Sequence, residues 1–287
     1  MMRRLPAIIL LFIFVISFSR VRAQMYYTAN ELGIALGGSQ YFGDLNDNYG
    51  FKTIGPAGGI YVRRRMNGYI SLKIVADYTQ VGYDDKLSND YYDKMRNLNF
   101  RSDVIEMALQ AEFNFFKFVT GDPYNRWTPF LTGGIGAFYY NPYTTYNGTK
   151  YYLRPLGTEG QFVGYSGRKY GDVSACFPIG AGFKFWIAGG VNLTLEIADR
   201  LTTTDYLDDV SSTYAGASKF PTNSPAYLLQ DRSLEINPNG PPLGRPGKQR
   251  GNTASKDQYL MALLSISFHF TTYRCPHMSE DFIKVKR

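Results

Sequence analysis

Side chains suited to acid–base chemistry are scarce in this chain, which contains two histidines, His269 and His277. Ser265 and Ser267 precede His269 at alternate positions, so a strand here would place both hydroxyls and the imidazole on one face. Such a pair could serve nucleophilic catalysis, but the Gly-X-Ser-X-Gly sequence that exposes the serine of many hydrolases is absent. We therefore predict that the chain is not an enzyme and has no catalytic residues.

A second candidate for chemistry is the acidic cluster of Asp205, Asp208 and Asp209. Three carboxylates with nearby hydroxyls could hold calcium, but their spacing lacks the regular alternation and the glycine of a calcium-binding loop. We favour a structural role, in which these aspartates cap backbone amides or pair with Arg200. The glycines of residues 133–136 match no phosphate-binding loop that leads into a helix. We predict no cofactor and no metal.

These side chains must be positioned by strand-like segments whose connections alternate between short and long. We expect the segments at residues 29–39, 56–65, 69–81, 102–117, 128–140, 175–187, 191–202 and 258–270. Brief turns follow the second, fourth and sixth segments, whereas long polar loops follow the first, third, fifth and seventh. This rhythm is typical of bacterial outer-membrane barrels. We predict an all-β fold, an eight-stranded antiparallel transmembrane β-barrel with short periplasmic turns and long extracellular loops.

The ends of the chain indicate three parts. Residues 1–23 combine a basic start, an apolar stretch and a small-residue cleavage site, as a secretory signal peptide does. We assign residues 24–270 to the outer-membrane barrel, in contact with lipid, and residues 271–287 to a C-terminal tail, with both termini in the periplasm. The signal peptide carries four of the 31 basic residues and none of the 24 acidic ones. The small remaining charge argues against a nucleic-acid partner.

Alternation within the strands separates an apolar face from a mixed one. In residues 102–117, for example, Ile105, Met107 and Leu109 share one parity, while Glu106 and Glu112 share the other. The inner face therefore collects charges of both signs, and the predicted lumen charges are Arg63, Lys73, Asp77, Glu106, Glu112 and Glu196. Side chains just fill the interior of an eight-stranded barrel. We expect these charges to pair and plug the lumen rather than to line a selective pore.

The two cysteines are predicted to stay apart. Cys176 begins a strand at the outer surface, whereas Cys275 follows the last strand on the periplasmic side. A disulfide needs Cα atoms within about 7 Å of each other, and the apolar band of a barrel wall is about 25 Å tall. The Cys275 thiol is then either free or bonded to a partner protein. Cys275 and His277, which flank Pro276, are too few for a closed zinc site, which takes four ligands.

The stretch Pro238–Lys256 is rich in proline and glycine and contains basic residues but no acidic ones. Such a composition cannot bury a core of its own. We expect a solvated surface loop, with contact to acidic lipopolysaccharide as the alternative.

Four segments together resemble a known family. They are Gly37–Leu45, Leu156–Gln161, Thr204–Tyr214 and the pair Cys275-Pro276. They resemble the outer-membrane barrels of Bacteroidota that include PorG, a component of the type IX secretion system. The resemblance implies an eight-stranded barrel associated with a periplasmic ring of the lipoprotein PorK and its companion PorN, and it does not imply an enzyme.

We therefore predict a non-enzymatic barrel that anchors or organises a periplasmic ring of PorK-like and PorN-like proteins. The candidate partner-binding residues follow the last strand, and they are Cys275, Pro276, Phe282, Ile283 and Val285. The alternative is a surface barrel whose long extracellular loops bind a ligand or polysaccharide.

Overall fold

The structure, a computed structural model, describes residues 29–47 and 49–271. The predicted signal peptide lies outside these residues. So do the tail residues named above, Cys275, Pro276, His277, Phe282, Ile283 and Val285. Neither the proposed domain boundaries nor the partner-binding residues are therefore tested by it.

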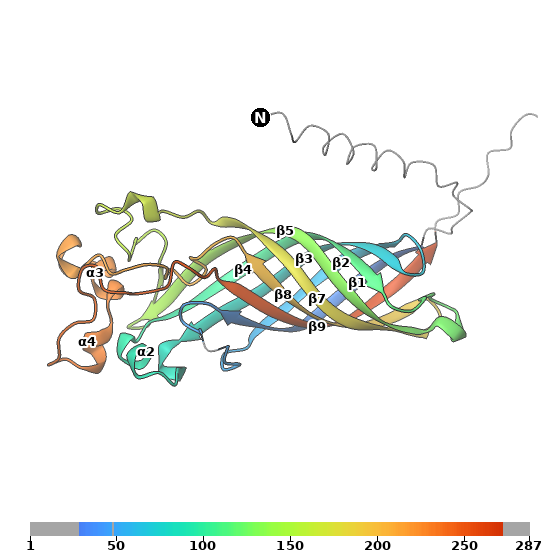
Figure 1. The fold of residues 1–287 in the computed structure, drawn as a ribbon, viewed down its shortest axis with the longest axis horizontal. Coiled ribbons are helices and arrows are strands. Elements are labelled where there is room, and N and C mark those ends of the chain that lie inside the picture. Colours follow the sequence, from blue (N-terminus) through green and yellow to red (C-terminus); the bar gives the residue numbers. More distant parts are fainter. Residues whose placement is uncertain (1–28, 48, 272–287) are drawn as a thin grey trace, which may run out of the picture. The chain divides into compact units, whose positions relative to one another are not determined.

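Antiparallel strands dominate the described part of the chain (Figure 1). They are β1 (Ala29–Phe42), β2 (Gly55–Arg65), β3 (Ile70–Asp84), β4 (Asn99–Asn114), β5 (Trp127–Tyr146), β6 (Thr149–Tyr152), β7 (Val173–Ala188), β8 (Val191–Thr202) and β9 (Gln258–Thr271). The hydrogen-bonded order is β4-β3-β2-β1-β9-β8-β7-β5, and β5 pairs in turn with β4. This closes eight strands into a barrel, so the predicted fold class is confirmed.

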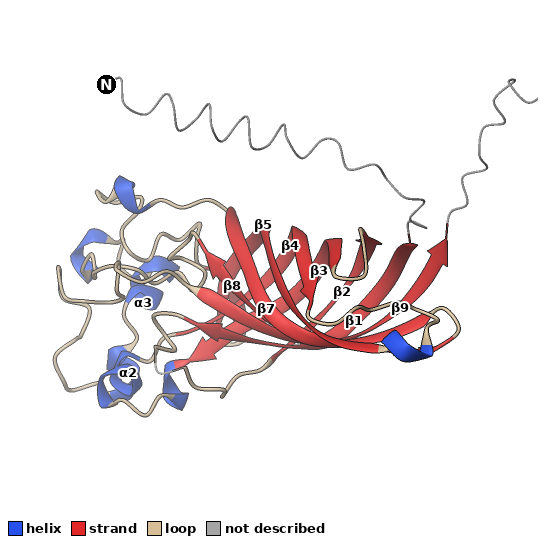
Figure 2. Cartoon of the chain, turned by 45° about the vertical axis from the view of Figure 1, so that its right-hand side comes forward, coloured by secondary structure: helices blue, strands red, loops and turns tan. Residues whose placement is uncertain are grey.

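The two ends of the barrel differ as predicted. Short connections join β2 to β3 and β7 to β8 at the end where β1 begins and β9 ends, which we call the short-turn end. The opposite, long-loop end carries the helices α2 (Tyr91–Arg96) and α3 (Pro225–Gln230), as Figure 2 shows, and also α4 (Ser233–Ile236), which is labelled in Figure 1. Among the described residues, no helix has the length and apolar character needed to cross a membrane.

The connection from β4 to β5 is longer than the sequence suggested, because β4 ends at Asn114 and β5 begins at Trp127. Phe118 lies in this connection, is 3% exposed, and donates its backbone N–H to the carbonyl of Gly68. Thr120 accepts hydrogen bonds from the side chains of Arg65 and Asn192. The segment is therefore not a simple turn, since its side chains pack into the short-turn end of the barrel.

The hairpin of β5 and β6 was missed from the sequence. β5 continues to Tyr146, and β6 pairs with residues 143–146 of β5 beyond the stretch at which β7 pairs with it. Asn147 and Gly148 join the two strands with φ values of 48° and 78°. Asn-Gly is the sequence that favours such a turn, so this signal was present in the sequence.

The outer wall of the barrel is apolar. Side chains that alternate along each strand face outward, and among the most exposed are Ile74, Met107, Ile135 and Ile179. Their neighbours of opposite parity are buried and mainly polar. This is the reverse of a water-soluble barrel and matches a wall that faces hydrocarbon. Buried apolar side chains gather instead beneath the long loops, and they include Tyr41, Val81, Phe100, Leu153 and Leu207.

Candidate functional site

The ion network of the lumen is organised around Glu112, which is 1% exposed and lies two residues from the short-turn end of β4. Its carboxylate lies 2.8 Å from Nε of Arg63 on β2 and 2.6 Å from Nζ of Lys184 on β7. Nζ of Lys73 on β3 is 3.4 Å away. One carboxylate therefore meets three cations from three other strands, and these contacts hold non-adjacent walls together across the interior.

Further ion pairs extend the network in both directions. Lys73 also contacts Glu196 at 2.6 Å, and Arg63 contacts Glu31 at 2.7 Å. Toward the long-loop end, Arg200 lies 3.3 Å from Glu106 and 3.5 Å from Asp77. Tyr259 donates its hydroxyl to Glu106 at 2.7 Å.

The structure thus places all six predicted lumen charges inside the barrel and pairs each with an opposite charge. Sequence reasoning overlooked Glu31 and Lys184, and it assigned Arg200 to the wrong partner. All three have the inward parity of their strands, so the same alternation could have found them. What alternation cannot give is which charges meet across the lumen, because that depends on the stagger of the strands.

The serine–histidine pair considered from the sequence does not assemble. The nearest polar partner of His269 Nδ1 is the Arg65 guanidinium at 3.1 Å. A guanidinium only donates, so this nitrogen is the acceptor. Ser267 donates to Glu31 at 3.1 Å, and Ser265 lies 3.2 Å from the Tyr61 hydroxyl. These side chains belong to the packing of the lumen.

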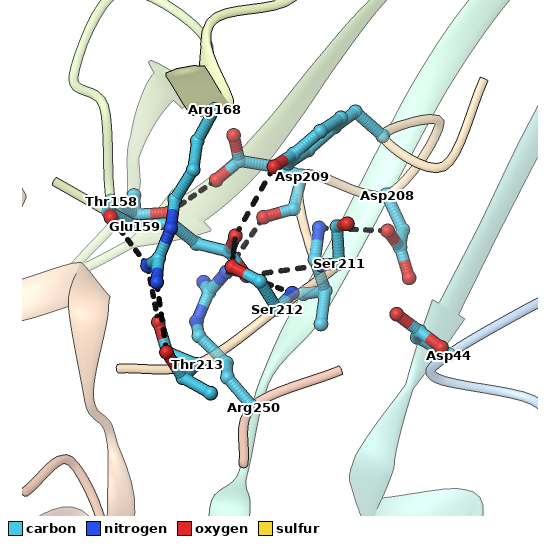
Figure 3. A network of polar contacts seen from close by, with 12 residues as sticks. Asp44, Thr158, Glu159, Arg168, Asp208, Asp209, Ser211, Ser212, Thr213 and Arg250 are labelled. Carbon is cyan, nitrogen blue, oxygen red and sulfur yellow. Dashed lines mark hydrogen bonds and ion pairs between the residues drawn. The ribbon is translucent and has the colours of Figure 1, made fainter. Parts of the chain in front are cut away.

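At the long-loop end, the three resemblance segments within the described residues meet in one polar network (Figure 3). Glu159 of Leu156–Gln161 is fully buried. It accepts the backbone N–H groups of Ser211 and Ser212 at 3.0 and 3.1 Å. It also lies 3.2 Å from Nη1 of Arg250. A buried carboxylate thus ties the loop after β6 to the loop after β8.

The segment Gly37–Leu45 joins the same network through Tyr41. The Tyr41 hydroxyl lies 2.6 Å from Oδ2 of Asp208 and 3.0 Å from Oδ1 of Asp257. Asp44 accepts the backbone N–H of Asn252 at 2.9 Å. We call the connected residues around Tyr41, Glu159 and Arg250 the loop cap.

Several carboxyls of the loop cap hold their protons unusually tightly. Burial, reinforced by the nearby charges of Asp205 and Glu159, raises the pKa of Asp44 to about 7. Burial raises the pKa of Asp208 and of Asp257 well above the usual range, and repulsion from Asp257 adds to it at Asp208 and repulsion from Asp44 at Asp257. The Tyr41 hydroxyl has one proton, so it donates to one of these two carboxyls at a time.

Of the three aspartates of residues 205–209, Asp208 caps a backbone amide as predicted, whereas Asp205 and Asp209 accept side-chain hydroxyls. Asp208 accepts the backbone N–H of Val210 at 2.8 Å, and Asp209 accepts the hydroxyl of Tyr170 at 2.6 Å. The predicted pairing with Arg200 is wrong, because Arg200 is used by Glu106 and Asp77 in the lumen. No group of three or more acidic, histidine or cysteine side chains in the described part of the chain has a geometry that could hold a metal ion.

The prediction of a solvated loop for Pro238–Lys256 is wrong for Arg250. This residue is 3% exposed, and it donates from Nη1 to the carbonyl of Asp209 at 2.6 Å. Glu159 offsets the cost of burying the guanidinium. Because this partner lies far away in the sequence, composition alone could not reveal it. Cys176, for its part, is a buried free thiol.

The closed barrel, the apolar outer wall and the filled interior define the fold class of outer-membrane β-barrels. The chain belongs to the family described as "Domain of unknown function (DUF6089)", which matches residues 6–218. This match includes the three segments that meet in the loop cap. Comparison with curated proteins finds no match.

Among solved structures, the chain is similar to three bacterial barrels. One is Ail, the attachment invasion locus protein of Yersinia pestis, in complex with the heparin analogue sucrose octasulfate. It is 10% identical with a TM-score of 0.41, and the match covers 85% of this chain and 100% of that one. Neisserial surface protein A is 11% identical with a TM-score of 0.38, over 85% and 98%. The N-terminal β-barrel domain of Pseudomonas aeruginosa OprF is 11% identical with a TM-score of 0.35, over 85% and 99%. Values this low carry no functional argument.

Replacing Glu112 by glutamine is expected to lower the free energy of unfolding by about 3–5 kcal/mol, because Arg63, Lys73 and Lys184 lose the anion that compensates their burial. Urea titration of the barrel refolded in phospholipid micelles measures this change. The matched control is Glu235→Gln, which removes a partly exposed ion pair with Arg232 and should cost less than about 1 kcal/mol. Equal effects of the two variants would contradict the central role of Glu112 in the ion network of the lumen.

The filled lumen predicts that the barrel does not conduct ions. Purified protein inserted into planar lipid bilayers should give no stable single-channel steps, because ion-paired side chains and the segment containing Phe118 occupy its interior. Insertion is checked independently by the heat-dependent gel shift of folded barrels. Reproducible conductance steps from folded protein would show that the lumen is open.

The loop cap should loosen as the pH rises. Folding raises the pKa of Asp44 to about 7 and that of Asp209 to about 6, so the folded cap binds protons more tightly than the unfolded chain. Its stability is then fully present below about pH 4 and falls as the pH rises through about 7. Hydrogen exchange at Leu207 and Val210, corrected for intrinsic rates, should show weaker protection at about pH 8 than at about pH 5.

The variant Asp44→Asn keeps an acceptor for the Asn252 amide but removes one titrating group, and it should flatten this pH dependence. Asp231→Asn, in the long loop after β8 and outside the loop cap, should leave it unchanged. Protection that increases with pH in the wild-type protein would show that the predicted direction of the pH dependence is wrong.

Proposed function

We propose that this chain is a non-enzymatic outer-membrane barrel that anchors or organises a periplasmic ring of PorK-like and PorN-like proteins in the type IX protein secretion system. In this proposal the short-turn end faces the periplasm, as it does in other barrels with short turns on one side. The observation that carries the proposal is the filled lumen.

The filled lumen supports an anchoring role because it argues against transport of a solute through the barrel. Glu112 and its three cations fill the lumen toward the short-turn end. Phe118 and Thr120 occupy the short-turn end. A barrel filled in this way has little room for a solute, so its useful surfaces are its two ends and its outer wall.

The loop cap supports placing the partner at the other end. Its characteristic side chains, such as Glu159 and Tyr41, are buried and bonded to one another. They are therefore committed to holding the loops together and are not displayed to a partner. At the short-turn end, by contrast, Tyr124 is 97% exposed, and the sequence continues from β9 into the segment that contains Cys275.

The test is a pull-down of the tagged full-length barrel from outer membranes in mild detergent, followed by mass spectrometry with and without reductant. Recovery of a periplasmic ring lipoprotein together with its companion is the expected result. The variant Cys275→Ser examines whether a mixed disulfide contributes, and Cys176→Ser is the matched control because that thiol is buried. Loss of the lipoprotein from non-reducing gels in the first variant alone would assign the bond to Cys275.

A barrel that is recovered alone, although folded and abundant, would contradict the anchoring role. Recovery with surface polysaccharide in place of ring components would favour the alternative, in which the long loops bind a ligand.

A further inference from the structure

A second feature of the long-loop end is a cavity of about 470 Å³ beside the β5–β6 hairpin. It is formed by the end of the hairpin and the loop that follows it, and it adjoins the loop cap, because Tyr170 lines the cavity and also donates to Asp209. The residues that matter for its chemistry are Asn141, Tyr152, Arg154, Gln161, Phe162 and Lys169. Its volume falls within the range of small-molecule sites.

Three side chains that line the cavity each contain a buried polar atom for which the described residues offer no hydrogen-bond partner. The atoms are Nε2 of Gln161, Nε of Arg154 and Oδ1 of Asn141. Gln161 is only 2% exposed, and its Oε1 is held by the backbone N–H of Glu159 at 2.9 Å. Its amide nitrogen is therefore fixed in place with donors unused. Buried polar groups almost always have partners, so three such atoms around one cavity indicate that it is built for a polar guest.

The remaining walls describe the shape and charge of that guest. Tyr152 and Phe162 line the cavity with rings that are 44% and 58% exposed, as flat apolar surfaces accessible to a ring-shaped ligand. Lys169 lies with Nζ 5.3 Å from the centre of the Phe162 ring. Arg154 also lines the cavity, and its Nη2 lies 3.3 Å from the partly exposed Asp172. The described residues of the lining thus include two cations and no carboxylate.

We propose that this cavity binds an anionic sugar, a pyranose that carries a carboxylate or a phosphate. The aromatic rings would contact the apolar face of the pyranose. Gln161 and Asn141 would bond its hydroxyls, one as donor and the other as acceptor. Arg154 and Lys169 would bind the acidic group through charge-assisted hydrogen bonds. This inference does not depend on the anchoring role, because it concerns the opposite end of the barrel.

The test measures binding of defined sugars to the purified full-length barrel in detergent by saturation-transfer NMR and calorimetry. The probes are D-glucuronate, D-glucose 6-phosphate and neutral D-glucose. At least one anionic probe should bind with a dissociation constant on the order of 1 mM and at least roughly tenfold tighter than glucose. Binding by only one of the two assigns the acidic group as carboxylate or phosphate.

Two variants locate the site, each with a matched control elsewhere on the loops. Lys169→Gln and Phe162→Ala should each weaken binding of the anionic probe by roughly fivefold or more. Lys219→Gln and Phe51→Ala change equally exposed residue types outside the cavity and should leave binding unchanged. The heat-dependent gel shift confirms that each variant is folded. Absence of binding, equal affinity for glucose, or equal effects of variants and controls would overturn the proposal.

Discussion

The rest of the structure depends on one constraint, which is that a wall with an apolar exterior must keep its charges inside and paired. Glu112 meets this constraint for three cations at once, and Glu106 does so with Arg200 and Tyr259. Because side chains alternate along a strand, a slip of one residue in any register would turn a row of charges outward. The ion network therefore stabilises the lumen and also fixes which strand residues face each other.

The same requirement recurs in a different form at the long-loop end. Buried apolar residues supply a core there, but specific polar contacts join one loop to another, as in the bonds from Glu159 to Ser211 and Arg250. Tyr41 lies between two carboxyls whose burial raises their pKa. Long loops with this bonding form a folded layer.

Much of the barrel could be predicted because one rule, alternation, determines which face each strand residue takes. It located the strands closely and placed Lys73, Asp77 and Glu196 in the lumen. It could not identify contacts made across space, such as Glu112 with Lys184, because these depend on strand stagger. Arg250 shows the same limit in the loops. The composition of its segment predicts a solvent-exposed loop, and only the distant Glu159 explains why the Arg250 side chain is buried. The partner-binding residues after Thr271 stay a prediction.

The three segments that carry the resemblance within the described residues are internal to the loop cap, so their side chains report how the loops are built. A barrel can retain that architecture while its exposed surfaces serve different partners, since fold alone does not determine function. The surfaces able to distinguish one role from another are those that the cap leaves free. At one end this is the turn that displays Tyr124, and at the other it is the cavity lined by Phe162 and Lys169. The functional question therefore rests on these two exposed regions and not on the segments that are easiest to recognise.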